Sequence, residues 1–351
     1  MNHRRLIRWA GGALICAHGL LPAGLPAGSA PPPAAPPVAF GVALDGAASR
    51  ERLAHLEQAL ELEIGLVAIF IQFPEDPRHD NFPAEQLDAI RQAGGRPVLT
   101  WEPMYIADGE EHAIPAEELT GGAYDAYIRR FARGVKAFPE PVIIRFAHEM
   151  NLDRYHWGST AEDYGPSAPT RYRAMFRHVV EIFRDEGAAE HARFAFNPNA
   201  ESVPSPDRDP DADWNRPEAY YPGDAYVDVL GMDGYNWGTT RTREEHGWDS
   251  RFQSFQTIFE PLYRTLRDLA PDKPIYVFET ATVTDGGDKA AWIEQAAASA
   301  VAWELAGLVW FHNDKEENWR LDTGVTPEDL EPLRRMITDP EALLEGRSRG
   351  D

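Results

Sequence analysis

The chain has 351 residues, a formal net charge of −23 and 43% hydrophobic residues. This acidity argues against a nucleic-acid partner, because phosphate binding requires clustered Lys and Arg. The hydrophobic content is ample for one large core, and a barrel of alternating strands and helices commonly fills this length as a single domain.

The amino-terminal segment is not expected to belong to the fold. Arginines open the chain, a short apolar stretch follows, and small residues at 27–30 offer a cleavage site. This pattern predicts a signal peptide over 1–30, a Pro/Ala-rich linker over 31–37, and hence a secreted or periplasmic protein. The alternative is an uncleaved membrane anchor, but the glycines and prolines of the apolar stretch make that stretch a poor membrane span. Once the signal is removed, no stable membrane insertion is expected.

The single cysteine, Cys16, lies inside the predicted signal peptide. Lipid attachment is not expected there, because Ile15 precedes it where a small residue would be needed. The mature chain would then hold no thiol, which excludes disulfides, cysteine–metal sites and thiol nucleophiles.

Strand and helix signals alternate over 38–340, and a charged tail follows over 341–351. Strands are predicted over 38–44, 65–73, 96–101, 141–149, 193–197, 226–233, 274–279 and 307–311. Helices are predicted over 50–62, 83–93, 124–138, 171–186, 252–269 and 289–304. This alternation is typical of an α/β fold, and eight strands predict a (β/α)8 TIM barrel in a single domain.

Two of the predicted strands share one design. Each begins after a proline, continues as an apolar run and ends in a glutamate: His148-Glu149 closes one, and Glu279 closes the other. Parallel barrels carry their chemistry at the carboxyl ends of the strands, and a glycosidase needs two facing carboxylates. The alternative for either glutamate is a helix cap or a surface ion pair. Arg145, inside the first run, would need a buried carboxylate partner.

The sequence lacks the motifs of zinc enzymes, serine hydrolases and phosphate-binding loops. A zinc-binding helix would need a second histidine where Leu152 stands, and neither a Gly-x-Ser-x-Gly motif nor a glycine-rich phosphate loop after the first strand is present. No metal or other cofactor is therefore predicted at the two glutamates.

An acidic connection over 204–221 is the longest irregular segment, and such loops are usually functional. Its acidic residues fall at calcium-loop intervals, although Ala212 stands where that loop needs glycine. They are Asp207, Asp209, Asp211, Asp213 and Glu218. A calcium site and a solvated acidic loop both remain open.

Six segments in order, covering roughly residues 40–322, resemble glycoside hydrolase family 26, whose best-known members are endo-β-1,4-mannanases. They are Thr100-Trp101-Glu102-Pro103, His148-Glu149-Met150-Asn151 with Arg145, Phe196-Asn197-Pro198-Asn199, Gly234-Tyr235-Asn236-Trp237, Phe278-Glu279-Thr280, and Trp310-Phe311 with Asn313, Lys315 and Trp319.

The resemblance implies a retaining mechanism in which Glu149 is the acid/base and Glu279 the nucleophile. Retention needs the two carboxyl groups about 5–5.5 Å apart. At that separation the charge on Glu279 would keep Glu149 protonated. Arg145 would keep the nucleophile charged, and its alternative role is a purely structural ion pair.

The resemblance also implies substrate-binding residues. His148 would contact the sugar, Tyr235 would hydrogen-bond the nucleophile, and the face of Trp310 would stack under the sugar ring; core packing is the alternative for each. Further tryptophans line additional subsites or pack in the core, and Glu102 binds substrate or braces the mouth. These tryptophans are Trp101, Trp157 and Trp237.

The sequence departs from the family pattern over 152–157, where family members usually carry glycine and then Trp and Phe, and at Ala281, where glycine is usual. The expected partner is a β-linked polysaccharide, first β-1,4-mannan, with mixed-linkage β-glucan or β-1,3-xylan as alternatives. A non-catalytic polysaccharide-binding or exopolysaccharide-assembly protein is the alternative from another class. The protein is expected to be a monomer.

Overall fold

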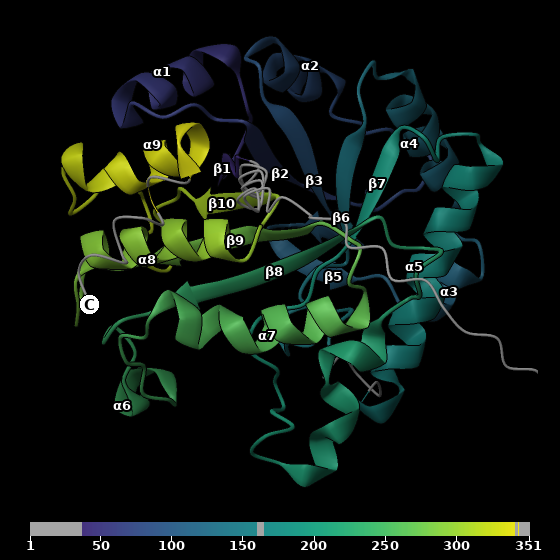
Figure 1. Cartoon of the computed structure of the whole chain (residues 1–351). Helices are drawn as coiled ribbons and strands as arrows, with labels where there is room; N and C mark the ends of the chain where they lie inside the picture. The colour runs from purple at the N-terminus through teal and green to yellow at the C-terminus, as the bar shows by residue number, and fades with distance from the viewer. Residues whose placement is uncertain (1–36, 160–164, 341–342, 344–351) are drawn as a thin grey trace, which may run out of the picture. The chain divides into compact units, whose positions relative to one another are not determined.

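The computed structural model describes residues 37–159, 165–340 and 343. These residues form a closed barrel of parallel strands with helices around it (Figure 1). Around the barrel the strands are ordered β1 (Ala39–Ala43), β10 (Gly307–Phe311), β9 (Ile275–Thr282), β8 (Val229–Asn236), β7 (Ala192–Phe196), β6 (Val142–Phe146), β3 (Arg96–Glu102) and β2 (Leu66–Gln72). The predicted α/β class and (β/α)8 barrel are confirmed.

The longer helices lie on the outside of the barrel, where all of them except the last connect successive strands (Figure 1). They are α1 (Arg50–Leu60), α2 (Ala84–Gln92), α4 (Asp125–Ala137), α5 (Ala168–Asp185), α7 (Phe255–Leu269), α8 (Lys289–Ala302) and α9 (Glu331–Thr338). Within the described ranges, every helix is too short or too polar to cross a membrane.

Local sequence explains where these helices begin and which side they bury. The Ser49 hydroxyl accepts a hydrogen bond from the Arg52 N–H at the start of α1, and Leu53, Leu56 and Leu60 are its buried residues. This is the combination of an N-cap and an apolar stripe that fixes a helix against a sheet.

The strands of the barrel are buried on both faces. All five residues of β6 are buried, as expected for a parallel strand with side chains inside the barrel and under the helices. Trp101 in β3 points outward, since its ring stacks on Phe131 of α4 with centroids 4.2 Å apart. Arg145 in β6 contacts side chains of β3, β8 and β9, two of which lie across the barrel from β6, and it therefore points inward.

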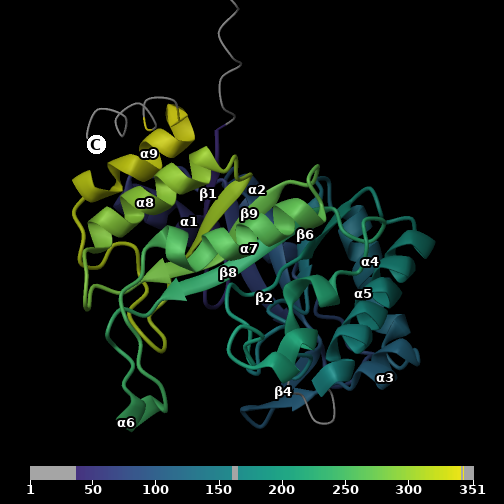
Figure 2. The same cartoon turned by 60° about the horizontal axis from the view of Figure 1, so that its bottom comes forward.

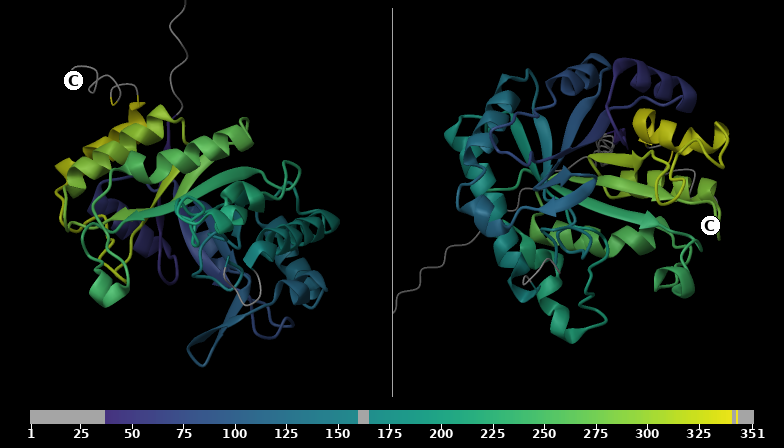
Figure 3. Two further views of the ribbon diagram at one scale, coloured as in Figure 1. Left: turned by 90° about the horizontal axis from the view of Figure 1, so that it is seen from below. Right: turned by 180° about the vertical axis from the view of Figure 1, so that it is seen from behind.

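Several short elements interrupt the alternation and were not predicted. They are the hairpin β4 (Met104–Ala107) with β5 (Glu110–Ala113), α3 (Ala116–Thr120), α6 (Arg243–His246), and the 3₁₀ helices η1 (Gly165–Ser167), η2 (Pro210–Asn215), η3 (Pro217–Tyr220) and η4 (Glu328–Leu330). Since β4 directly follows β3 and α6 follows β8, both the hairpin and α6 stand at the carboxyl ends of the strands. Figures 2 and 3 show them projecting from the same side of the barrel.

Several predicted strand boundaries are wrong; the strand expected over 226–233, for example, is observed as Val229–Asn236. The strand expected over 141–149 ends at Phe146, because Ala147 takes a left-handed conformation with φ of 50°. The predicted signal peptide lies outside the described residues, as do the linker and the tail except for Pro37 and Leu343.

Candidate active site

Glu149 lies just beyond the carboxyl end of β6, in a strained turn. Ala147 and Glu149 both have left-handed backbones, with φ of 50° and 52°. Such a conformation costs about 1–3 kcal/mol for a residue with a side chain and concentrates at functional sites. The Glu149 N–H donates to the carbonyl of Asn197 beyond β7 (2.8 Å), which holds the turn in place.

Asn199 is the direct partner of the Glu149 carboxyl group. Its side-chain amide donates to Glu149 Oε1 (2.6 Å). The backbone N–H of Asn199 donates to Asn151 Oδ1 (2.9 Å), and the Asn151 amide donates back to the Asn199 carbonyl (2.9 Å). Asn151 therefore fixes the donor that orients Glu149.

The surroundings of Glu149 favour its protonated form. Its residue is 6% exposed, and burial together with the charge of Glu279 raises the pKa of Glu149 to about 7, against the hydrogen bond from Asn199. A carboxyl group with a pKa near neutrality is suited to donate a proton.

Glu279 reaches the mouth of the barrel because β9 contains an extra residue. Met232 and Asp233 of β8 are consecutive, but their partners in β9 are Val277 and Glu279, and a matching shift occurs against β10. Side chains of a regular strand alternate between faces, yet Phe278 and Glu279 both contact the same guanidinium. A bulge re-aims side chains in this way and is common beside active sites.

Arg145 holds Glu279 from below. Completely buried, it donates to Glu279 Oε1 (2.7 Å), Asp233 Oδ2 (2.5 Å), Thr100 Oγ1 (2.7 Å) and Asn197 Oδ1 (2.7 Å). The buried carboxylate partner required by the sequence is present, and there are two of them. Burial disfavours the guanidinium charge, but Asp233 and Glu279 overcome this and raise the pKa of Arg145 above its ordinary value.

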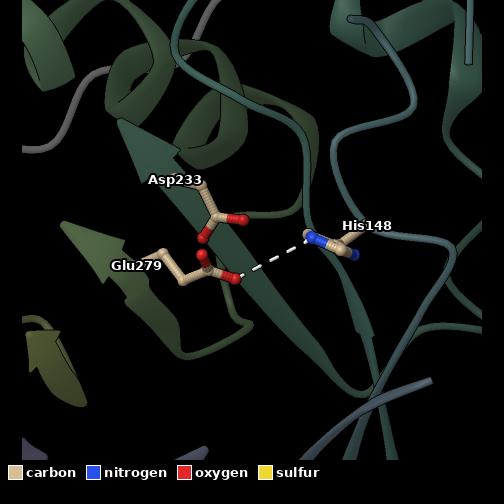
Figure 4. Close-up of side chains that lie close together, drawn as sticks. All are labelled: His148, Asp233 and Glu279. Atoms are coloured by element: carbon tan, nitrogen blue, oxygen red, sulfur yellow. Dashed lines mark ion pairs between the residues drawn. The ribbon is translucent and has the colours of Figure 1, made fainter. Parts of the chain in front are cut away.

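Tyr235 and His148 complete the surroundings of Glu279. The Tyr235 hydroxyl donates to Glu279 Oε2 (2.8 Å), and burial and the charge of Glu279 raise the pKa of Tyr235, which keeps the donor proton in place. His148 Nε2 lies 3.1 Å from the Tyr155 hydroxyl. The same nitrogen lies 3.8 Å from Glu279 Oε1, the contact drawn as a dashed line in Figure 4. Burial and the charge of Arg145 lower the pKa of His148 well below its ordinary value, so this imidazole is neutral.

The three side chains in Figure 4, His148, Asp233 and Glu279, are of the types that bind metal ions. One ligand atom each of His148, Asp233 and Glu279 lies within 4.8 Å of the others. However, the Arg145 guanidinium already donates to both carboxylates. A cation would have to share these oxygens with a buried positive charge, so the group does not fit a metal site.

Glu102 is another buried carboxyl group of the site, at the end of β3. It is 4% exposed and accepts a hydrogen bond from the side-chain amide of Gln72 (2.5 Å). Burial raises the pKa of Glu102 to about 7, and the charge of Glu279 adds to this. Its contact with Gln72 braces the ends of β2 and β3, and a role in substrate binding stays a prediction.

The structure places the predicted aromatic residues in two groups. Trp157 and Trp237 contact other residues of the site: the Trp157 indole, 1% exposed, donates to the His148 carbonyl (2.7 Å), and the Trp237 ring lies 6.3 Å from Tyr235. Trp101 and Trp310, both 0% exposed, pack away from the mouth.

Trp310 therefore has no free face for a sugar. Its ring meets Trp292 of α8 edge-on, with centroids 5.8 Å apart, and its N–H donates to the Trp319 carbonyl (2.7 Å). Because side chains alternate along β10, the next residue, Phe311, points toward the mouth and contacts Phe70 and Tyr235. The predicted stacking role of Trp310 is replaced by packing against α8.

The acidic segment 204–221 is folded around an arginine. Arg216 lies 2.6 Å from Asp213 and 3.5 Å from Asp207, and the Asp209 side chain caps η2 by accepting from the Asp211 N–H. Among the described residues, the acidic side chains of this segment do not form a group with the spacing of a metal site. The contacts favour the solvated acidic loop.

Comparison with known proteins matches this arrangement to a family. Residues 116–262 match the model described as glycosyl hydrolase family 26, and a 254-residue stretch is 36% identical to "Endoglucanase H" of Acetivibrio thermocellus, covering 71% of this chain and 25% of that protein. The barrel belongs to glycoside hydrolase family 26. A "Mannan endo-1,4-beta-mannosidase" of Bacillus subtilis is 24% identical over 132 residues, which are 36% of this chain and 33% of that protein.

The family 26 barrel also has solved structural relatives. A family 26 β-mannanase from Bacteroides ovatus superposes with a TM-score of 0.58 at 17% identity, covering 87% of this chain and 89% of that one. A Cellulomonas fimi endo-β-1,4-mannanase gives 0.58 at 18% identity, with 87% and 71% covered. At such identities the likeness concerns the fold. The matched stretches span from 12% to 33% of the curated relatives' own lengths.

The segment 152–157, where the sequence departs from the family pattern, forms one wall of the site. The Tyr155 ring stacks on Trp157 with centroids 4.6 Å apart, and its hydroxyl meets His148. Arg154 makes two hydrogen bonds of 2.8 Å with Glu111 in β5, which tie this wall to the β4–β5 hairpin.

Sequence reasoning missed Asp233, Asn199, Asn197 and Tyr155 as site residues. The two asparagines stand in a segment that carried the family resemblance, and this was the available signal. Asp233 precedes Tyr235 by two residues at the end of β8, so strand alternation places both on the same face. Tyr155 lies in a loop that has no regular pattern, and only the tertiary structure brings it to His148.

Proposed function

We propose that this protein is a retaining endo-glycosidase that hydrolyses a β-linked polysaccharide by double displacement. The observation that carries the proposal is the contrast between two buried carboxyl groups at one mouth. Glu149 has a pKa raised to about 7, whereas Glu279 accepts hydrogen bonds from Arg145 and Tyr235 that stabilise its charged form. A retaining glycosidase needs one protonated and one ionised carboxyl group.

The two groups would act in sequence. Glu149 donates its proton to the glycosidic oxygen while Glu279 attacks the anomeric carbon, so that the C–O bond to the leaving chain breaks and a covalent glycosyl–enzyme ester forms. Glu149, now ionised, then takes a proton from water, which attacks the same carbon and releases Glu279. The Tyr235 hydroxyl, at 2.8 Å from Glu279, stabilises the carboxylate before attack and on release.

Glu149→Ala and Glu279→Ala test this assignment separately. We expect each variant to lose at least about a thousandfold in kcat, because general acid catalysis and the nucleophile each contribute on this scale. Azide should restore rate to Glu149→Ala on activated aryl glycosides. Glu63→Ala is the control, since Glu63 is exposed and lies before β2 at the opposite rim. Full hydrolysis of every glycan by either active-site variant would contradict the proposal.

The polymer is proposed as β-1,4-mannan first and β-glucan second. Mannanases among the similar proteins support mannan, whereas the 36% identity to "Endoglucanase H" over 71% of this chain supports β-glucan. Release of reducing ends from mannan, glucomannan, lichenan, cellulose and β-1,3-xylan separates these candidates. A protein that binds one of these glycans without releasing reducing ends would be the non-catalytic alternative.

Export and a monomeric state are also proposed. The basic start, apolar stretch and small residues over 1–30 support a signal peptide. Amino-terminal sequencing of the protein recovered outside the cytoplasm should find a start after residue 26, and sedimentation should give the mass of one chain. Retention of Met1 with the cell membrane would instead favour the anchor.

A further inference from the structure

Trp248 is a large apolar side chain left exposed on the rim of the barrel. Its exposed fraction is 42%, and among the described residues the other large hydrophobic side chains that stand exposed are Ile106 and Val203. Trp248 follows α6, in the connection from the carboxyl end of β8 to α7, and α6 projects clearly from the barrel in Figure 2. The indole therefore stands on the face of the barrel that holds the carboxylates.

Ring contacts join Trp248 to the active site. The Trp248 ring meets Trp237 edge-to-face with centroids 6.1 Å apart, and Trp237 meets Trp319 at 4.8 Å. Trp319 in turn lies 5.1 Å from Tyr235, whose hydroxyl donates to Glu279. We call these four residues, Tyr235, Trp319, Trp237 and Trp248, the aromatic track. These ring contacts join the candidate nucleophile to an exposed indole, and they pass through Trp319, which is 1% exposed.

The segment that carries Trp248 is fixed at its base. Arg241 and Ser250 pair through two hydrogen bonds, from the Arg241 N–H to Ser250 Oγ (2.9 Å) and from the Ser250 N–H to the Arg241 carbonyl (3.0 Å). The Arg241 guanidinium lies 4.5 Å from the Trp237 ring and donates to Glu317 Oε1 (2.8 Å). The loop is therefore held against the track, and little freedom remains to be lost when a ligand binds.

We propose that Trp248 is a distal sugar-binding platform, on which one pyranose ring of the substrate chain stacks, away from the cleaved bond. The indole offers a flat apolar surface to the C–H face of a pyranose, and the ring contacts of the track join that surface to Tyr235, which donates to Glu279. The inference deepens the proposed function and rests on it for the substrate class. Trp248 was not among the predicted site residues.

Chain length gives the test. For wild type, Trp248→Ala and Trp248→Phe, kcat/KM is measured on aryl β-glycosides of a disaccharide and of a hexasaccharide from glucomannan and from lichenan. Trp248→Ala should lower the hexasaccharide-to-disaccharide ratio of kcat/KM about tenfold, mainly through KM, because stacking with the far sugar is lost. Trp248→Phe should restore most of the ratio. Trp303→Ala removes an indole near the opposite rim, at the end of α8, and should leave the ratio as in wild type.

Two results would overturn the inference while the proposed function stands. One is a ratio that stays within twofold of wild type in Trp248→Ala; the other is an equal loss on both chain lengths, which would mean that Trp248 only supports the fold. Sedimentation can overturn the inference as well, because an exposed indole can also pair two copies of the chain. A wild-type dimer that Trp248→Ala dissociates without changing the ratio would assign the surface to that contact.

Affinity electrophoresis in gels containing glucomannan or lichenan separates failure of the inference from failure of the proposed function. If the wild type hydrolyses no glycan but is retarded in a gel, and Trp248→Ala is retarded less, the platform stands and the hydrolase proposal fails. If the wild type neither hydrolyses nor binds these polymers, both are overturned.

Discussion

Glu149 and Glu279 are the same residue type at the ends of two barrel strands, but their surroundings differ in charge. Glu149 receives a neutral amide from Asn199 and stands in a left-handed turn. Glu279 receives the Arg145 guanidinium and the Tyr235 hydroxyl and stands on a bulged strand. Burial is nearly equal, at 6% and 4% exposure, so the two carboxyl groups differ in their hydrogen-bond donors rather than in their exposure.

Two glutamates of one site can therefore take different roles, one as acid/base and one as nucleophile, because their neighbours differ. A buried carboxyl group without a cation keeps its proton, and its charged neighbour strengthens this effect. The guanidinium of Arg145 is therefore the element on which the difference depends. Each prediction below changes one side of this comparison.

Arg145→Met should have the largest effect. It leaves Asp233 and Glu279 buried without their cation, and breaking a buried pair in this way costs about 3–5 kcal/mol. We expect kcat to fall at least about a thousandfold, because Glu279 would lose the guanidinium that holds its carboxyl group in place. Urea denaturation and steady-state kinetics measure the two losses. Arg129→Met, which removes two ion pairs of more exposed side chains, with Glu186 and Asp185, should change stability by less than about 1 kcal/mol.

Glu149→Gln should make the protein more stable, and only at high pH. The pKa of Glu149 is about 7 in the fold and 4.5 ordinarily, so its contribution to stability is complete below 4.5 and is lost as pH rises through 7. Relative to wild type, the glutamine variant should gain about 3 kcal/mol near pH 8.5 and little near pH 5. Urea unfolding at both pH values measures this, and an equal gain at both would contradict the assigned pKa.

Glu279→Gln should make the protein less stable than wild type. It leaves Arg145 with the single carboxylate of Asp233, so the free energy of unfolding should fall by about 2–3 kcal/mol at both pH values. The same urea measurements serve both variants. A stabilising effect of Glu279→Gln would mean that the two carboxyl groups are not distinguished by their donors.

Tyr235→Phe should have a smaller effect on activity. A hydrogen bond from a hydroxyl to a charged group contributes about 1.5–3 kcal/mol, so we expect kcat to fall roughly ten- to a hundredfold with less change in KM. Tyr172→Phe is the matched control, because its buried hydroxyl has no hydrogen-bond partner among the described residues. Equal losses in the two variants would assign the effect to packing.

Glu102→Gln should change the activity least, and it shows which carboxyl group causes the alkaline limb of the pH profile. Burial raises the pKa of both Glu102 and Glu149 to about 7, so either could produce the alkaline limb of kcat/KM. Because protonated Glu149 is the proposed acid, activity should fall as pH rises through 7, and the limb should stay within about 0.3 of a pH unit in Glu102→Gln. Loss of the limb would transfer it to Glu102.

The barrel and the strand ends that carry the chemistry follow from local patterns in the amino-acid sequence. Alternating apolar runs and amphipathic helices predict parallel strands with helical crossovers, since both periods follow from local geometry. The same patterns placed Glu149, Glu279 and Arg145 on neighbouring parts of one mouth, because all strands of a parallel barrel end on one side. The position of Arg145 inside an apolar strand also predicted a buried carboxylate partner, since a buried charge must be paired.

Tertiary structure alone decided which side chains face the mouth. Trp310 and Phe311 are adjacent in sequence, and only the packing of Trp310 against α8 assigns the inward position to Phe311. The bulge that brings Phe278 and Glu279 to one guanidinium is set by pairing with β8 and β10, which no local pattern records. Trp248 joins the aromatic track through contacts with residues distant in the chain, and such contacts depend on the closed barrel rather than on any one segment.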